Sequence, residues 1–164
     1  MEYSVTCRAL FEVKRRVTII MSTTSHVYEI IIDATPETVW KAITDGEQTQ
    51  KYYFDGRVES DWKAGSTYHY YGPDGSVISD GNIVEIEAQS HLKTTWRPAW
   101  LGDAPASTVI WDVQSVGPVT LLKLTHTDVD DATFEEAQFH VGWIFVISSM
   151  KSLLETGKAL PSIM

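Results

Sequence analysis

The stretch FHVGWIFVISSMKSLLETG, residues 139–157, decides the fold that we expect for this chain. Its apolar residues recur at steps of three and four, which is the period of an α-helix. The run WIFVI, residues 143–147, is apolar around the whole circumference, so other parts of the chain must cover this helix on more than one side. We therefore predict a long helix over residues 134–157, ending at Gly157 and held in a curved sheet.

The residues before this helix supply the sheet. Short runs rich in strand-forming residues, separated by turn signals, occupy residues 57–129. Short links between them favour an antiparallel meander, because parallel strands need long crossovers. The longest link is PAWLGDAPA, residues 98–106, which has room to act as a lid. The six expected strands cover 57–62, 66–71, 77–88, 92–97, 107–116 and 119–129.

A further strand and two short helices precede this meander. The segment HVYEIIID, residues 26–33, has the composition of a strand. Thr35 and Pro36 then form a strong helix start, as N-cap and first helical residue. Thr44-Asp45-Gly46 ends this helix, and residues 47–54 suggest a second one.

Residues 1–25 differ from the rest of the chain. The basic run Lys14-Arg15-Arg16 interrupts an alternating pattern, and the polar residues 22–25 are typical of the loose start of a domain. We expect an N-terminal extension over residues 1–25 that need not belong to the core, followed by one domain over residues 26–160. Whether Met21 is the biological start, or the extension is an extra edge strand or a partner-binding arm, stays open.

Charge and cysteine content narrow the classes of function. Lys and Arg number 13 and Asp and Glu number 22, giving a net charge of -9. This balance, without a basic stripe, argues against binding to nucleic acid. The single cysteine, Cys7, cannot form an intrachain disulfide and fits a reducing compartment. With no signal-peptide layout and no apolar run long enough to cross a bilayer, we expect a cytoplasmic protein without membrane insertion.

No motif for catalysis or metal binding stands out. The five histidines lack the spacing of a metal site, and no glycine-rich phosphate loop or serine-hydrolase elbow occurs. Glu85, Glu87 and Asp112 are possible acids, but exposed strand carboxylates are the preferred interpretation. We therefore predict no catalytic residue, no metal and no cofactor.

Four segments carry a resemblance to a known family. They are 33–45 (DATPETVWKAITD), 62–68 (WKAGSTY), 81–86 (GNIVEI) followed by Leu92, Thr95 and Trp96, and 140–143 (HVGW). Together they resemble the START-like superfamily, also called SRPBCC, and within it the bacterial homologues of the C-terminal domain of the heat-shock protein 90 ATPase activator. The match spans about residues 26–159. It implies an α+β helix-grip fold, in which a curved antiparallel sheet surrounds a long C-terminal helix, with two short helices after the first strand.

The resemblance, together with the aromatic residues, predicts an internal cavity for a hydrophobic small molecule. An empty space of roughly 300 Å³ between sheet and helix would cost about 7 kcal/mol at about 24 cal/mol per Å³. That cost rivals a domain's total stability of about 5–15 kcal/mol, so ligand, water or large side chains must fill the space. The predicted ligand-binding residues are Tyr70, Trp96, Trp111, His126, Trp143 and Ile147.

Within this set the tryptophans would supply stacking surface, while Tyr70 and His126 would be polar anchors. For His126, a buried neutral ring bonded to a neighbour is the competing interpretation. The predicted function is a carrier or sensor of an apolar or aromatic molecule that enters beneath residues 98–106. Two alternatives stay open: a cyclase or aromatase using a cavity acid or base, and a chaperone-associated interaction module, for whose protein partner the sequence gives no support.

Overall fold

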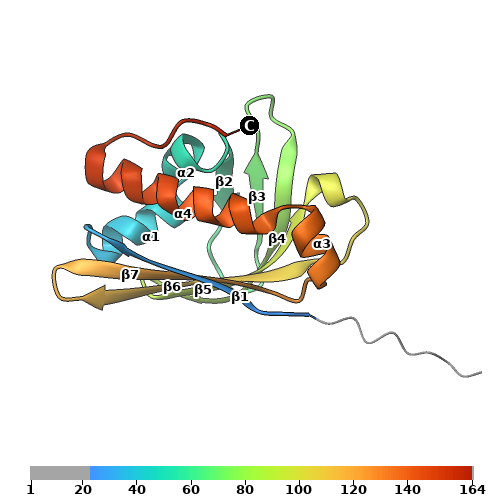
Figure 1. Ribbon diagram of the computed structural model, residues 1–164, viewed down its shortest axis with the longest axis horizontal. Coiled ribbons are helices and arrows are strands. Elements are labelled where there is room, and N and C mark those ends of the chain that lie inside the picture. The colour runs from blue at the N-terminus through green and yellow to red at the C-terminus, as the bar shows by residue number, and fades with distance from the viewer. Residues whose placement is uncertain (1–22, 164) are drawn as a thin grey trace, which may run out of the picture.

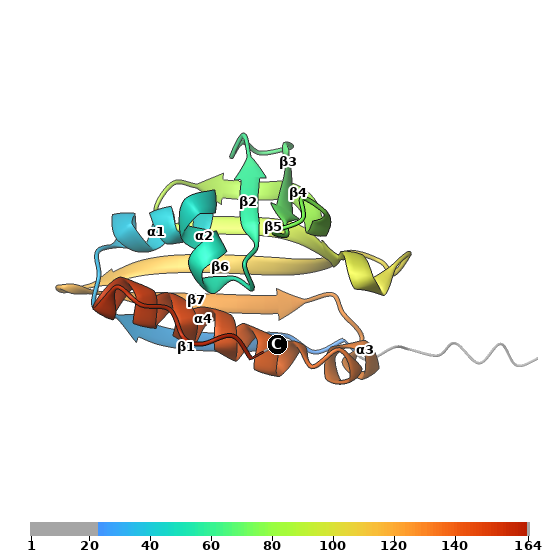
Figure 2. The ribbon, with the colours of Figure 1, turned by 90° about the horizontal axis from the view of Figure 1, so that it is seen from above.

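Residues 23–163 are described by the computed structural model, with the seven strands forming one sheet and the helices packed over its concave face (Figures 1 and 2). Most of the predicted extension 1–25, including Cys7 and Met21, lies outside the described residues. Thr23 and Thr24 precede the first strand, and the Thr24 backbone N–H donates to Asp131 Oδ1 at 3.2 Å.

The sheet is antiparallel throughout, in the order β1-β7-β6-β5-β4-β3-β2. Its two edge strands are therefore β1 and β2. The predicted strands are confirmed with small shifts at their ends. The observed bounds are β1 His26–Ile32, β2 Arg57–Ser60, β3 Thr67–Tyr71, β4 Val77–Glu87, β5 His91–Pro98, β6 Ser107–Val116 and β7 Val119–Thr127.

The two short helices are α1, Pro36–Thr44, and α2, Gly46–Tyr52. The Thr35 side chain caps α1 by accepting from the Thr38 N–H, as the sequence predicted. Asp45 ends α1 and at once caps α2, because its side chain accepts from the Glu47 N–H. One residue therefore sets the turn between the two helices.

The predicted C-terminal helix over 134–157 is wrong at its start. The structure has a separate helix α3, Asp131–Glu136, and a long helix α4, Phe139–Thr156. Gln138 separates them in a left-handed conformation with φ of 54°, which ends the helical path of α3. No Gly or Pro marks residues 131–139, so the break leaves no simple sequence signal.

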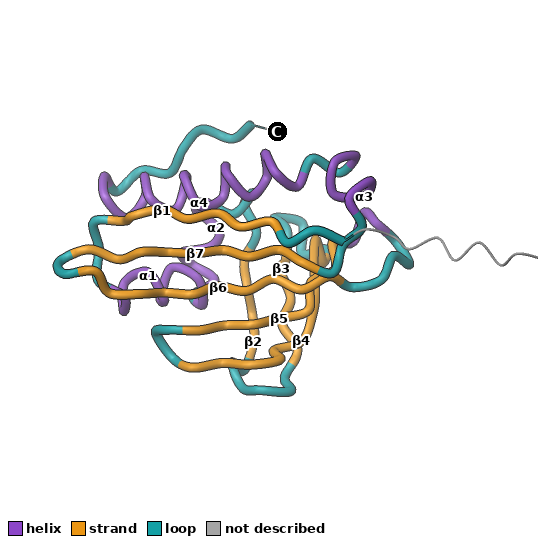
Figure 3. The backbone as a smooth tube through the Cα atoms, turned by 60° about the horizontal axis from the view of Figure 1, so that its bottom comes forward, coloured by secondary structure: helices purple, strands orange, loops and turns teal. Residues whose placement is uncertain are grey.

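Strong curvature of the sheet lets it surround α4. In Figure 3, β2 and β3 run at a steep angle to β1, β6 and β7, and β4 bends from one direction to the other. Inward-facing residues alternate along the strands; Leu122, Leu124 and His126 on β7 are completely buried. Among the described residues, no helix has both the length and the apolar character needed to cross a membrane.

Candidate functional site

The space between the sheet and α4 is almost filled by the protein's own side chains. A cavity of about 20 Å³ remains there, and its lining includes Tyr53, Tyr70, Trp96, Trp111 and Trp143. Such a volume holds about one water molecule. The structure therefore leaves no ligand-sized gap at the place where the sequence predicted one.

Packed aromatic rings explain why this interior is full. Tyr53 stacks on Tyr70, with ring centroids 4.3 Å apart and planes 19° from parallel. Trp143 enters from α4 and meets Trp96 at 5.3 Å and Trp111 edge-on at 6.1 Å. Rings at these separations and tilts pack favourably, so they fill the interior and stabilise it.

A much larger apolar cleft, of about 690 Å³, opens beside the first turns of α4. Its walls come from residues 53–54, the start of β4, the short 3-10 helix η1 (Ala99–Leu101), residues 137–139, 141–143 and 146, and Ile163. Trp96 and Trp143 belong to its lining, which contains no Asp, Glu, Lys, Arg or His among the described residues. The volume lies within the usual range of about 300–1,000 Å³ for small-molecule sites.

Two residues of the segment predicted to act as a lid, Ala99 and Trp100, form one rim of the cleft. Within residues 98–106, η1 begins after Pro98 and ends at Gly102, whose positive φ of 57° suits glycine. Trp100 is left 65% exposed at this rim, although it lines the cleft. An exposed tryptophan beside an apolar hollow is a feature of binding surfaces.

A glycine near the start of α4 leaves another part of the cleft wall open. A Cβ added at Gly142 would meet no atom within 4 Å, although the residue lines the cleft. A side chain at this position would therefore project into open space. Gly142 keeps that part of the cleft free.

The chain after α4 folds back along the helix (Figure 1). The Leu160 N–H donates to Ser149 Oγ at 3.1 Å, and the Ser152 hydroxyl donates to the Lys158 carbonyl at 2.7 Å. These bonds hold the returning segment against the helix. It brings Ile163 to the cleft wall.

His126 lies beneath the aromatic layer and is completely buried. Its Nδ1 accepts from the Trp143 indole N–H at 3.0 Å, and its Nε2 is 2.7 Å from the Ser107 hydroxyl. Because an indole nitrogen only donates, the neutral ring must carry its proton on Nε2, which donates to Ser107. The Ser107 hydroxyl in turn donates to the Trp96 carbonyl at 3.2 Å. Burial, and secondarily the charge of His26, lowers the pKa of His126 to about 4.

The predicted binding residues fall into three places. Trp96 and Trp143 line both the small cavity and the cleft. Tyr70 and Trp111 line the small cavity, whereas His126 and Ile147 are buried and belong to neither lining. His126 instead orients Trp143, which agrees with the interpretation of a buried histidine bonded to a neighbour.

Several cleft residues were missed by the sequence analysis, namely Tyr53, Ser79, Trp100 and Gly142. The aromatic run at residues 52–54 and the tryptophan in the 98–106 link were visible signals. Ser79 and Gly142 gave none, because a small residue becomes informative only when its neighbours in space are known.

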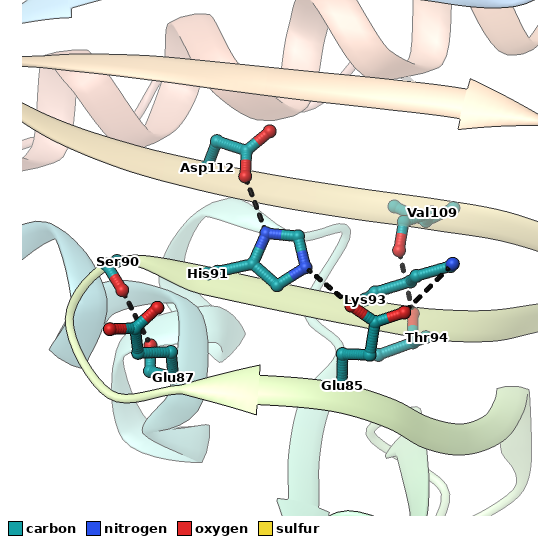
Figure 4. Close-up of polar contacts among 8 residues, drawn as sticks. All are labelled: Glu85, Glu87, Ser90, His91, Lys93, Thr94, Val109 and Asp112. Atoms are coloured by element: carbon teal, nitrogen blue, oxygen red, sulfur yellow. Dashed lines mark hydrogen bonds and ion pairs between the residues drawn. The ribbon is translucent and has the colours of Figure 1, made fainter.

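A cluster of charged residues on the outer face of the sheet is the other candidate site (Figure 4). On β5, His91 Nδ1 lies 2.6 Å from Asp112 Oδ1 of β6, and His91 Nε2 lies 3.7 Å from Glu85 Oε2 of β4. Lys93 Nζ lies 3.1 Å from Glu85 Oε1. These residues line neither the cleft nor the small cavity. Within residues 23–163, no group of three or more His, Cys, Asp or Glu could hold a metal ion. The cluster acts as a cross-strand charge ladder, of the kind that adds about 0–1 kcal/mol per exposed pair.

The family model described as "Activator of Hsp90 ATPase homolog 1-like protein" matches residues 33–155, which is most of the chain. The chain belongs to this family. The match covers α1 through all but the last residue of α4, and thus nearly every element that builds the cleft. Among curated proteins, none matches the chain.

Solved structures agree with this family membership at the level of fold. A Staphylococcus saprophyticus protein superposes with a TM-score of 0.69 at 20% identity, covering 85% of this chain and 97% of that one. The Aha1 dimer from Colwellia psychrerythraea gives 0.69 at 20% identity, covering 83% and 99%. An HSP90 activator from Plasmodium falciparum gives 0.65 at 21% identity, covering 79% and 95%. The helix-grip fold of the family is therefore shared by this chain.

Proposed function

We propose that this protein binds an apolar or aromatic small molecule in the cleft beneath η1, as a carrier or sensor. The observation that carries the proposal is an apolar cleft of about 690 Å³ whose lining has no charged side chain among the described residues. Trp96 and Trp143 supply aromatic surface in its lining, and Trp100 supplies it at the rim. Sites for small molecules commonly combine such apolar walls with a few polar groups.

The chemistry of the lining favours binding over acid–base catalysis. Tyr53 is the one titratable side chain that lines the cleft in the described part of the chain. Burial raises the pKa of Tyr53 far above its usual value, so the phenol stays protonated at ordinary pH. A cyclase-type mechanism would need a group that exchanges protons near neutral pH.

A protein partner is the other function to test, since two of the similar structures are an Aha1 dimer and an HSP90 activator. Exposed apolar side chains beside the cleft, at Trp100, Val141 and Ile144, could serve either a ligand entrance or a partner. The cleft favours the small molecule, because its volume of about 690 Å³ lies in the range of small-molecule sites and a flat partner surface would leave it unfilled.

The proposal is tested by filling the cleft from Gly142. The variant Gly142→Phe projects a ring into the open space, whereas the matched control Gly142→Ala adds one methyl group. The probe is N-phenyl-1-naphthylamine, an uncharged dye that fluoresces in apolar surroundings. We expect saturable binding to the wild type and to Gly142→Ala, and binding at least about tenfold weaker in Gly142→Phe, the equivalent of about 1.4 kcal/mol.

Thermal unfolding accompanies the titration, because a lost cleft must be separated from a lost fold. Both variants should unfold at or above the wild-type temperature, since replacing a helical glycine stabilises by about 0.5–1 kcal/mol. Equal dye affinity in all three folded proteins would refute the cleft as the binding site.

A further inference from the structure

Two buried polar groups in the wall of the cleft have no hydrogen-bond partner among residues 23–163. They are the indole Nε1 of Trp96 and the hydroxyl of Ser79, in side chains that are 5% and 2% exposed. Both residues line the cleft. A buried polar group without a partner costs about 1–3 kcal/mol, so a ligand that bonds to it regains that energy.

The sheet register brings these two groups to one part of the wall. Ser79 on β4 lies opposite Pro98 on β5, and Trp96 is two residues before Pro98 on the same face of β5. Diagonal neighbours on one face of an antiparallel pair lie about 7–8 Å apart, within reach of one small molecule. On its other side Ser79 lies opposite Tyr70, whose ring stacks on Tyr53.

The polar atoms of this wall are suited to donate hydrogen bonds. An indole N–H can only donate, and a serine hydroxyl can turn to donate toward a neighbouring acceptor. The Tyr53 hydroxyl also lies near the Trp96 N–H, which partly offsets the effect of burial on the Tyr53 pKa. No hydrogen bond of normal geometry joins the pair, and the indole Nε1 is itself buried, so an acceptor oxygen in the cleft reaches it only after a small shift of the Trp96 ring.

Charge on the ligand is disfavoured at the same place. Arg97, which follows Trp96, points to the opposite face of β5, where its guanidinium holds Asp80 through bonds of 3.2 and 3.0 Å. No cationic side chain among the described residues lines the cleft to meet a carboxylate or phosphate. An ionised group in an apolar wall without a partner would carry a large desolvation cost.

Building on the proposed function, we infer that the ligand is an uncharged, mostly apolar molecule bearing an acceptor oxygen, such as a carbonyl, that faces Trp96 and Ser79. The apolar body occupies the space below η1, between Trp100 and the first turns of α4. The oxygen is the specificity-determining group, because it accepts from Ser79 Oγ–H and Trp96 Nε1–H.

The test compares 2-acetylnaphthalene with 2-ethylnaphthalene, which has nearly the same shape but no oxygen, and with the anion 2-naphthoate. Each competes with N-phenyl-1-naphthylamine for the wild type, Ser79→Ala and Trp96→Phe. The measured quantity is the ratio of two dissociation constants, that of the ethyl compound divided by that of the acetyl compound. The two compounds differ in hydrophobicity, but this difference is the same for every protein, so it cancels when the ratio is compared between proteins. We expect each variant to lower the ratio about fivefold.

Matched controls make the same chemical changes away from the cleft. Ser115→Ala alters an exposed serine at the end of β6, and Trp40→Phe alters a half-buried tryptophan on α1. Both should keep the wild-type ratio. In the wild type, the indole N–H resonance that is missing from Trp96→Phe should also move downfield with the acetyl compound and stay in place with the ethyl compound.

The outcomes separate the two proposals. If the dye and both neutral naphthalenes fail to bind, the proposed function fails and this inference with it. If both bind but the ratio is unchanged in Ser79→Ala and Trp96→Phe, the cleft is a binding site and the acceptor inference is overturned. Tightest binding by 2-naphthoate would overturn it as well.

Discussion

Protonation of His126 would place an N–H on Nδ1, directly facing the N–H of Trp143. Two donors cannot bond to each other, and the ring is completely buried, so the charged form is strongly disfavoured. A single neutral imidazole thus fixes the indole of Trp143 and, through Ser107, the backbone of Trp96. The positions of Trp143 and Trp96 in the cleft lining therefore depend on the protonation state of His126.

Stability should therefore fall in mild acid. The pKa of His126 is lowered from 6.5 to about 4 on folding, so between these values the unfolded chain binds more protons. The contribution is complete above about pH 6.5 and is lost as the pH falls toward about 4. Urea unfolding should show a loss of about 2 kcal/mol between about pH 7 and about pH 5.

His126→Gln is the control for this pH dependence. The amide oxygen of glutamine can accept from Trp143 and its nitrogen can donate to Ser107, but the group does not titrate. The variant should be less stable at neutral pH and should lose less stability on acidification. Equal pH dependence in both proteins would assign the acid sensitivity to other groups.

At the scale of elements, two glycines should respond in opposite ways to the same substitution. On β4, a Cβ at Gly81 would collide with the Thr95 carbonyl of β5, whereas at Gly142 on α4 it would meet open space. We expect Gly81→Ala to lower the free energy of unfolding by about 1–3 kcal/mol and Gly142→Ala to raise it by about 0.5–1 kcal/mol. Parallel urea titrations measure both, and destabilisation by Gly142→Ala would contradict an open wall there.

The elements that could be predicted are those with strong local signals. Thr35 and Pro36 mark the start of α1, and Gly157 marks the end of α4 with a positive φ of 77°. The break at Gln138 could not be predicted, because glutamine rarely adopts a left-handed conformation and tertiary packing imposes it here.

Prediction of the site was limited for a related reason. Alternation along the strands places Trp96 and Trp111 on the inner face, but it does not reveal whether a ring fills the interior or lines a hollow. That depends on contacts between elements distant in sequence, such as the stacking of Tyr53 on Tyr70. The fold follows from patterns along the chain, while the position of the cleft follows from packing.

At the scale of the molecule, we expect the aromatic core to stabilise the fold and the cleft to bind the ligand. Trp100 is expected to contribute to binding and not to stability, because it is 65% exposed and lines the cleft. We expect Trp100→Ala to change the free energy of unfolding by less than about 0.5 kcal/mol. The same variant should weaken dye binding about tenfold, because it removes aromatic contact area at the rim. A large loss in the free energy of unfolding of Trp100→Ala would contradict the expectation that this residue serves binding alone.

The returning segment after α4 carries a practical consequence for anyone handling this protein. Because Ile163 lies at the cleft wall, a purification tag or fluorescent fusion attached just beyond it starts close to the cleft. Such an appendage is tethered at high local concentration and would compete with added compounds even if its intrinsic affinity were weak. Affinities for the unmodified protein are best measured with the label attached at the other end, or removed by protease beforehand.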